Sequence, residues 1–342
     1  MIYFDVTKAK GAGHRSGLMR VSSRLAEELG DAVVPVRWSE WDRAALQADD
    51  WFLTSELFSE EERPGITAFL MNPRCRLGAI FHDAIPLKHP HITWPQSVAR
   101  HPGYMKLLTQ FNRVWAVSEA SRDELVGFWR WQGVMKFPAT EVIALGADFN
   151  RAPRITKRSG PGTGRASLLC VGILEPRKNQ LFLLKVVEEL WGEGVNFDLH
   201  LVGRVNPHFG RPIVASIENL RRRFPTALHY HSSADDTMVA SLYATARASV
   251  FPTMAEGCGL PLLESLWMGV PCVCSNLPVL RENTAGGGCL PVTLNDRVNW
   301  KAALRRLVTE DAMPSILRAE ATTRALPTWA DAAKSLRDAL EG

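Results

Sequence analysis

The chain has 342 residues, of which 46% are hydrophobic and 22% are charged, a composition that is ordinary for a globular enzyme and excludes a disordered chain. Its formal net charge of +4 is too small to indicate nucleic-acid binding by itself. Because the length exceeds what one hydrophobic core usually supports, we expect two α/β domains.

The N-terminal residues and the cysteines indicate a cytoplasmic protein. Residues 1–5 contain no basic segment followed by a long apolar stretch, so we expect no signal peptide. No window approaches the ~18 consecutive apolar residues that a membrane span requires. The six cysteines lie mostly in apolar, strand-like runs, which is typical of free thiols in a reducing compartment. We therefore expect at most a peripheral contact with the inner membrane surface.

Strand-like runs alternate with helical patterns in the first part of the chain, which predicts a parallel sheet with crossover helices. A helix is expected at 18–29. The expected strands are 2–6, 32–36, 51–53, 77–81, 114–117 and 141–144. A segment rich in Arg, Pro, Gly and Ser follows and indicates a linker that ends the first domain, residues 1–150.

A second alternation fills the domain expected at residues 151–327. Its expected strands are 168–172, 198–202, 227–231, 248–252 and 270–275. Its expected helices are 180–191, 213–222, 237–246 and 261–268. Two such series predict an α/β protein with two Rossmann-like, doubly wound parallel-sheet domains.

A glycine-bearing loop follows the strand expected at 248–252 and carries two carboxylates, Glu256 and Glu264. Pro261 stands where the first residue of the next helix is expected. The glycines allow a ligand close to the backbone, and the N–H groups of the helix N-terminus favour an anion. The alternative is that Glu264 only complements the helix dipole while Glu256 is solvated.

A second loop, after the strand expected at 168–172, contains Gly172 and then Arg177 and Lys178 at the expected start of a helix. The helix macrodipole disfavours cations at that end, so the pair suggests an anionic ligand that both residues meet. The alternative is a solvated surface with no ligand.

Two further features lie in the first domain. The loop from Gly11 to Gly17 approximates a dinucleotide fingerprint, but Arg37 and Trp38 stand where a ribose-binding acid should follow. We therefore interpret it as a glycine turn that approaches a ligand. His82 and Asp83 end another expected strand, where a hydrogen-bonded structural histidine and a functional one are equally compatible with the sequence.

We expect no metal site. The pairs His89/His91 and His229/His231 each lack a third ligand at zinc-like spacing, and no Asp-x-Asp motif occurs. The basic run 221–223 indicates a solvated helix end, with an anionic membrane surface as the alternative.

Together these motifs resemble family 4 of the retaining GT-B glycosyltransferases, and within it bacterial polysaccharide mannosyl- and rhamnosyltransferases. The family's two glutamates separated by seven residues correspond to Glu256 and Glu264, and its Gly…Arg-Lys-Asn element corresponds to Gly172 and residues 177–179. The resemblance implies a GT-B fold whose two domains face a cleft. It also implies that residues 328–342 form a helix that crosses back onto the first domain.

The resemblance further implies a role for each matched residue. Arg177 and Lys178 would hold a diphosphate, Glu264 the ribose, and Glu256 the sugar hydroxyls. The implied donor-binding set is Gly172, Arg177, Lys178, Cys258, Gly259, Leu260 and Glu264. The implied acceptor and sugar side consists of Gly13, Gly17, His82 and Asp83. The implied catalytic residues are Glu256, Arg177, Lys178 and His82.

The expected reaction is metal-independent hexose transfer from a nucleotide diphosphate sugar, with GDP-mannose favoured, to a saccharide or lipid-linked saccharide. Retention without an obvious nucleophile implies front-face displacement, in which the leaving diphosphate takes the acceptor proton. The alternatives are an epimerase or phosphorylase of the same fold and a non-catalytic nucleotide-sugar-binding subunit. An NAD oxidoreductase is disfavoured because the ribose carboxylate is missing.

Overall fold

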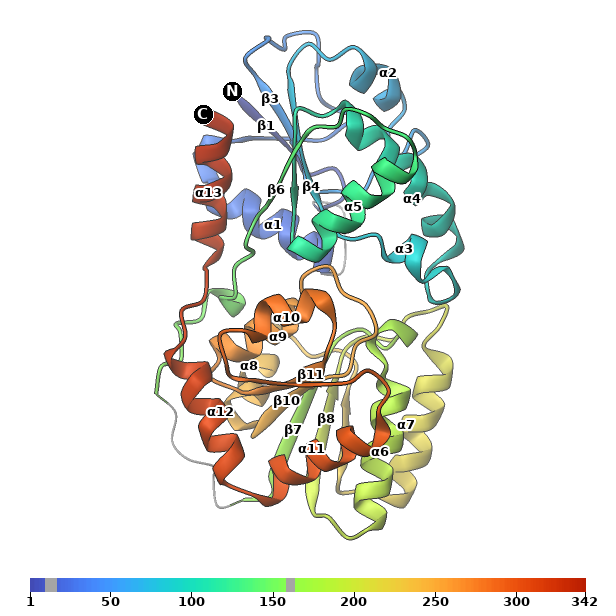
Figure 1. The fold of residues 1–342 in the computed structure, drawn as a ribbon, viewed down its shortest axis with the longest axis vertical. Helices are drawn as coiled ribbons and strands as arrows, with labels where there is room; N and C mark the ends of the chain where they lie inside the picture. Colours follow the sequence, from blue (N-terminus) through green and yellow to red (C-terminus); the bar gives the residue numbers. More distant parts are fainter. Residues whose placement is uncertain (10–16, 158–163) are drawn as a thin grey trace. The chain divides into compact units, whose positions relative to one another are not determined.

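The computed structural model describes residues 1–9, 17–157 and 164–342, which divide into two compact units (Figure 1). Unit 1 consists of Met1–Gly146 and Pro327–Gly342, and unit 2 is Ala147–Leu326. Each unit contains a parallel sheet of six strands. The doubly wound α/β architecture expected from the alternating pattern is therefore confirmed.

The sheet of unit 1 has the strand order β2-β1-β3-β4-β5-β6. Its strands are β1 Ile2–Asp5, β2 Val34–Val36, β3 Trp51–Thr54, β4 Arg76–Phe81, β5 Arg113–Ala116 and β6 Ala139–Val142. Its helices are α1 Gly17–Leu29, α2 Ile66–Met71, α3 Ile85–Lys88, α4 Pro95–Leu107, α5 Glu119–Trp131 and α13 Trp329–Glu341. The chain winds in opposite directions from β1, so the carboxyl ends of β1 and β3 mark the switch point of this sheet.

Helix α13 completes unit 1 and packs against α1 (Figure 1). A capping box between Thr328 and Asp331 fixes its N-terminus. Gly146 makes room for it, because a Cβ at that position would stand 2.6 Å from the Cα of Trp329. Trp329 is buried at 3% exposure, so the last helix is part of the core of this unit.

The sheet of unit 2 has the order β12-β11-β10-β7-β8-β9. Its strands are β7 Ala166–Val171, β8 Phe197–Val202, β9 Leu228–His231, β10 Ala248–Phe251, β11 Cys272–Ser275 and β12 Cys289–Val292. Its helices are α6 Gln180–Gly192, α7 Arg211–Arg223, α8 Asp236–Thr245, α9 Leu260–Trp267, α10 Pro278–Thr284, α11 Arg297–Thr309 and α12 Ala312–Thr323. The switch point lies at β7, between β8 and β10.

Burial follows the alternation of strand side chains. In β8, Leu199 and Leu201 are fully buried and join the core that α6, α7 and α11 cover, whereas His200 between them is only partly buried. Side chains of successive strand residues point to opposite faces, so one strand contributes to the core and to the other face alternately.

The predicted strands and helices are confirmed to within a few residues, but several elements were not predicted. Strand β12 contains Pro291 and lies at the edge of its sheet, as β2 with Pro35 does in the other sheet. Proline cannot donate to the sheet ladder and is tolerated at an edge, which weakened the sequence signal for β12. None of the helices formed by the described residues combines the length and the apolar character that a membrane span requires.

Candidate functional site

The loop after β7 carries the basic pair in a short turn of its own. Pro176–Lys178 form a 3₁₀ turn, Asn179 adopts a left-handed conformation with φ 59°, and α6 begins only at Gln180. Arg177 and Lys178, expected at the start of the helix, therefore lie in a separate turn just before it. Asn179 separates them from it, and its side chain fixes the turn by donating to the carbonyl of Pro252 at 3.0 Å.

Lys178 already has an anionic partner in unit 2. Its Nζ lies 2.5 Å from Oε1 of Glu256, and its aliphatic part packs along Gly172. The ammonium also lies 5.0 Å from the centroid of the Phe251 ring. Lys178 is 8% exposed, so the expectation of a cation that awaits a ligand is corrected: the protein supplies a carboxylate itself.

Glu256 accepts hydrogen bonds and ion pairs through both carboxylate oxygens. Thr253 Oγ1 donates to its Oε1 at 2.7 Å, and Arg177 Nη1 lies 3.1 Å from its Oε2. Burial opposes ionisation of Glu256, but Lys178 and Arg177 outweigh it and hold the pKa of this carboxyl below its usual value. The alternative of a solvated Glu256 is therefore wrong, because the side chain is a buried carboxylate between two cations.

Arg177 is oriented by a residue that sequence reasoning missed. Its Nε and Nη2 lie 3.1 and 2.8 Å from Oε1 of Glu175. The other oxygen of Glu175 accepts from Nδ2 of Asn206, in the loop after β8, at 3.1 Å. Glu175 therefore ties the loops after β7 and β8 together. The acid two residues before Arg177 was visible in the sequence, but its partner Asn206 is 31 residues away.

The glycine-bearing loop before α9 has the backbone that the motif requires. Gly259 has φ +87°, and a Cβ there would stand 2.6 Å from Cδ2 of Leu280. Helix α9 begins at Leu260, so Pro261 is its second residue and Glu264 lies just beyond the first turn, a shift of one position from the prediction. The carbonyl of Cys258 accepts from Nδ2 of Asn283 at 2.6 Å.

Glu264 is buried and Cys258 is partly buried at this end of α9. Glu264 is 4% exposed. Burial raises the pKa of the Cys258 thiol to about 12, so Cys258 is a neutral thiol at physiological pH. Its side chain therefore supplies no negative charge to this loop.

The two loops of unit 2 follow neighbouring strands. β7 and β10 pair in parallel, so their carboxyl ends bring Gly172, Arg177 and Lys178 next to Glu256 and Gly259. This is the switch point of the sheet, where doubly wound domains bind ligands. Backbone amides at the N-terminus of α9 and the side chains of Arg177 and Lys178 are suited to an anion.

His82 in unit 1 has the environment of a structural histidine and the position of a functional one. Its Nε2 lies 2.7 Å from the carbonyl of Ser55, so Nε2 carries the proton and Nδ1 is the acceptor. Burial lowers the pKa of His82, which keeps the imidazole neutral. Asp83 accepts from the amide of Ile85 at 3.0 Å at the start of α3.

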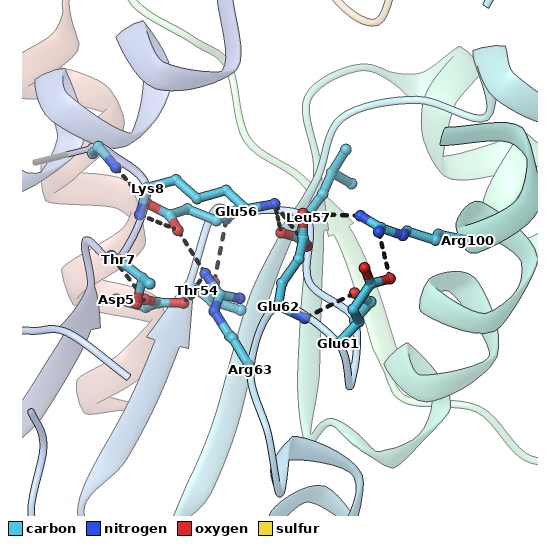
Figure 2. A network of polar contacts seen from close by, with 12 residues as sticks. Asp5, Thr7, Lys8, Thr54, Glu56, Leu57, Glu61, Glu62, Arg63 and Arg100 are labelled. Carbon is cyan, nitrogen blue, oxygen red and sulfur yellow. Dashed lines mark hydrogen bonds and ion pairs between the residues drawn. The ribbon is translucent and has the colours of Figure 1, made fainter. Parts of the chain in front are cut away.

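The switch point of unit 1 is occupied by a buried ionic cluster (Figure 2). Arg63 is fully buried, and its Nη2 lies 2.8 Å from Oδ2 of Asp5 and 2.5 Å from Oε2 of Glu56. The carboxylate of Glu56 also accepts the backbone amides of Lys8 at 2.8 Å and Ala9 at 2.9 Å. In a dinucleotide-binding domain, backbone amides at this place face a phosphate. Here they donate to a carboxylate of the protein, so the structure agrees with the prediction that this loop does not bind a dinucleotide. Of the glycines expected on the acceptor side, Gly13 lies outside the described residues and Gly17 begins α1.

A third histidine, His200, lies beside the pair His229/His231 in the neighbouring strand. His200 in β8 stacks on His229 at 4.5 Å, and its Nδ1 lies 3.1 Å from Nε2 of His231. The ring planes are inclined by only 17° and 2°, so the imidazole of His200 lies nearly parallel to the other two. The parts of the chain that the structure describes hold no group of three or more His, Cys, Asp or Glu residues suited to a metal ion.

Curated relatives of the chain are bacterial mannosyltransferases. The serotype-specific mannosyltransferase WbdA of Escherichia coli is 29% identical over 293 residues, which are 80% of this chain and 34% of WbdA. The O-antigen chain mannosyltransferase B of Escherichia coli is 28% identical over 219 residues, which are 61% of this chain and 55% of that protein. The chain thus spans only about a third of the length of WbdA.

Solved structures share the fold at low sequence identity. HepE of Anabaena, solved in complex with UDP and glucose, matches with a TM-score of 0.76 and 14% identity, over 100% of this chain and 99% of that one. Sucrose-phosphate synthase from Thermosynechococcus elongatus matches with a TM-score of 0.74 and 16% identity, over 99% and 98% of the two chains. These matches identify the two-sheet architecture as a GT-B fold.

A family model covers most of unit 2, which carries the cluster of Arg177, Lys178 and Glu256. Residues 165–310 match glycosyl transferases group 1. This range includes the loops after β7 and β10 and helix α9. The chain therefore has a GT-B fold, and most of its second unit matches the glycosyl transferases group 1 model.

Proposed function

We propose that the protein is a glycosyltransferase that moves a hexose from a nucleotide diphosphate sugar to a saccharide or lipid-linked saccharide acceptor in cell-surface polysaccharide synthesis. The observation that carries this proposal is the cluster of Arg177, Lys178 and Glu256 at the switch point of unit 2, beside the N-terminus of α9. GDP-mannose is the favoured donor, because the relatives are named mannosyltransferases.

Each side chain of the cluster has a proposed role. Arg177 and Lys178 bind the diphosphate together with the backbone around Gly259, and Glu264 binds the ribose. Glu256 binds hydroxyls of the transferred sugar. In unit 1, His82 and Asp83 belong to the acceptor and sugar side of the reaction.

The proposed reaction proceeds with retention of anomeric configuration. The acceptor oxygen attacks the anomeric carbon on the face from which the diphosphate leaves, and the bond from that carbon to the phosphate oxygen breaks. The departing diphosphate takes the acceptor proton. Arg177 and Lys178 stabilise the charge that develops on the diphosphate, so the proposal requires no divalent metal.

An assay with GDP-mannose, UDP-glucose and saccharide acceptors tests the proposal. Sugar transfer to an acceptor supports it, and proton NMR of the product reads the anomeric configuration. Conversion of the donor without an acceptor would instead indicate an epimerase. Nucleotide-sugar binding with no turnover across the acceptor panel would indicate a binding subunit.

We also propose that unit 1 makes a peripheral contact with an anionic membrane surface. Trp131 and Met135, at the end of α5, are 78% and 95% exposed. Trp129 Nε1 donates to the carbonyl of Met105 at 2.7 Å, which brings the end of α4 beside them. Residues 105–118 and 125–140 contain four basic residues and no Asp or Glu. An exposed tryptophan among cations suits the headgroup region of an anionic bilayer.

A further inference from the structure

We propose that the two glutamates around Arg177 and Lys178 differ in function: Glu256 is a displaceable counter-ion that the donor diphosphate replaces, and Glu175 is a permanent support of Arg177. This inference rests on the proposed function and concerns the same site. It assigns Glu175 as a positioning residue and gives Glu256 a second role before the sugar arrives.

The environment of Lys178 explains why a bound diphosphate would displace Glu256. Its ammonium is 2.5 Å from Glu256 Oε1 in a side chain that is 10% exposed. A buried ammonium needs a close anionic partner, since an unpaired charge in such a place is costly. When a diphosphate reaches Lys178, two anions compete for one buried cation. The ammonium has three N–H donors, but a diphosphate and a carboxylate on the same buried cation repel each other, and this repulsion drives the carboxylate of Glu256 away.

Arg177 meets its two glutamates through different nitrogens. Nε and Nη2 face Glu175, whereas Nη1 faces Glu256 Oε2 at 3.1 Å. Nη1 also donates to the carbonyl of Ala255 at 3.1 Å, and this bond does not depend on Glu256. Departure of Glu256 therefore leaves the guanidinium held by Glu175 and Ala255 and frees the second N–H of Nη1 for the phosphate. Guanidinium groups bind phosphate and carboxylate with the same planar geometry, so the exchange needs no change in the orientation of Arg177.

Glu175 is held from a second side, which makes it the fixed member of the pair. Asn206 Nδ2 donates to its Oε2 at 3.1 Å, and Asn206 is 3% exposed. Asn206 is in turn fixed because its Oδ1 accepts the amides of His208 and Phe209 at 3.0 and 3.2 Å. Glu175 thus connects Arg177 to a rigid turn after β8.

Displacement also explains how one carboxylate can serve both the empty and the occupied site. A nucleoside diphosphate without a sugar removes Glu256 from its cations and gives it no new partner. A nucleotide sugar gives the released carboxylate the hydroxyls of the hexose as hydrogen-bond donors. The wild-type protein should therefore bind GDP-mannose more tightly than GDP, and this preference should depend on the charge of Glu256.

Two isosteric variants, Glu256→Gln and Glu175→Gln, test the inference, because each removes one negative charge next to the same arginine. The measurement is the Kd of the full chain for GDP and GDP-mannose by titration calorimetry. We expect Glu256→Gln to bind GDP about tenfold more tightly and to lose most of the preference for GDP-mannose. We expect Glu175→Gln to bind GDP about tenfold more weakly, because Arg177 loses its support.

If the lost charge acts only through general electrostatics, both variants should bind GDP more tightly, and this result would overturn the inference. Weaker or unchanged GDP binding in Glu256→Gln would also overturn it. If Glu256→Gln does not fold, Glu256→Asp takes its place under the same criterion, because a shortened carboxylate also weakens the contact with Lys178. Absence of binding of GDP, UDP and dTDP to the wild type would refute the proposed function itself, which is a separate outcome.

Discussion

The ammonium of Lys178 and the carboxylate of Glu256 meet at 2.5 Å although 78 residues separate them in the chain. Both side chains are buried, at 10% and 8% exposure. The pair joins the loop after β7 to the loop after β10, so it contributes to the fold of unit 2 as well as to the proposed donor site. Removing either member therefore has a structural consequence.

We expect Lys178→Ala to destabilise the ligand-free protein, because Glu256 would keep its buried charge without its closest cation. Breaking a buried ion pair on one side costs about 3–5 kcal/mol. Turnover should also fall by about 10²- to 10³-fold, as when a donor to a developing oxyanion is removed. Denaturant unfolding without nucleotide measures the first effect. The double variant Lys178→Met, Glu256→Gln is the control and should recover most of the stability; equal stability of Lys178→Ala and wild type would contradict the buried pair.

We expect Glu264→Ala and Glu256→Ala to separate binding from turnover. Glu264 is proposed to hold the ribose in every state of the reaction, so its loss should raise the Kd for GDP by about tenfold or more. Glu256 is proposed to act on the sugar and to be displaced by the diphosphate, so its loss should lower kcat without weakening GDP binding. Calorimetry with GDP and steady-state kinetics distinguish the two. An unchanged Kd in Glu264→Ala would show that the ribose assignment is wrong.

Sugar transfer should persist in excess EDTA. Arg177 and Lys178 supply the positive charge at the proposed diphosphate position, and the transition state needs that charge from some source. The rate with donor and acceptor is measured before and after chelation, then after addition of manganese. Loss of activity on chelation and its return with manganese would refute the metal-independent mechanism.

The stability that Glu256 contributes should depend on pH in one direction. The pKa of Glu256 is lower in the folded protein than in the unfolded chain, so its contribution is complete above the ordinary glutamate pKa of about 4.3 and is lost as the pH falls through the lower folded value. Urea unfolding from about pH 7 to about pH 3 should therefore show a stability difference between wild type and Glu256→Gln that shrinks in acid. A difference that grows in acid would contradict the lowered pKa.

Replacing the exposed apolar residues at the end of α5 should weaken membrane binding. We expect Trp131→Gln with Met135→Gln to reduce co-sedimentation with vesicles that contain anionic lipid by about tenfold, and to leave thermal stability unchanged because both side chains are exposed. The matched control is Met71→Gln, which removes another exposed apolar side chain of unit 1, at the end of α2. Equal binding of the control and the double variant would mean that the surface around Trp131 does not contact lipid.

The sequence was sufficient for the architecture, because the alternation of strands and helices is a local pattern. The motifs around Arg177 and Glu256 are also local, and the assignment of a donor site to them stays a prediction. The sequence was insufficient for the pairings. Glu175 with Asn206, and Lys178 with Glu256, are separated by 31 and 78 residues, and only the folded sheet brings them together. For the same reason, a helix-dipole argument made from neighbouring residues misjudged Lys178, whose charge is compensated by a distant carboxylate.

The contact between Gly146 and Trp329 suggests that unit 1 could be expressed without unit 2. A Cβ at Gly146 would stand 2.6 Å from the Cα of Trp329, so the point where the chain leaves unit 1 touches the point where it returns. Unit 2 is topologically an insertion into unit 1. A linker of a few residues from Gly146 to Pro327 would close unit 1 into one continuous chain at a small entropic cost, and circular permutation at this junction would leave α13 packed on α1.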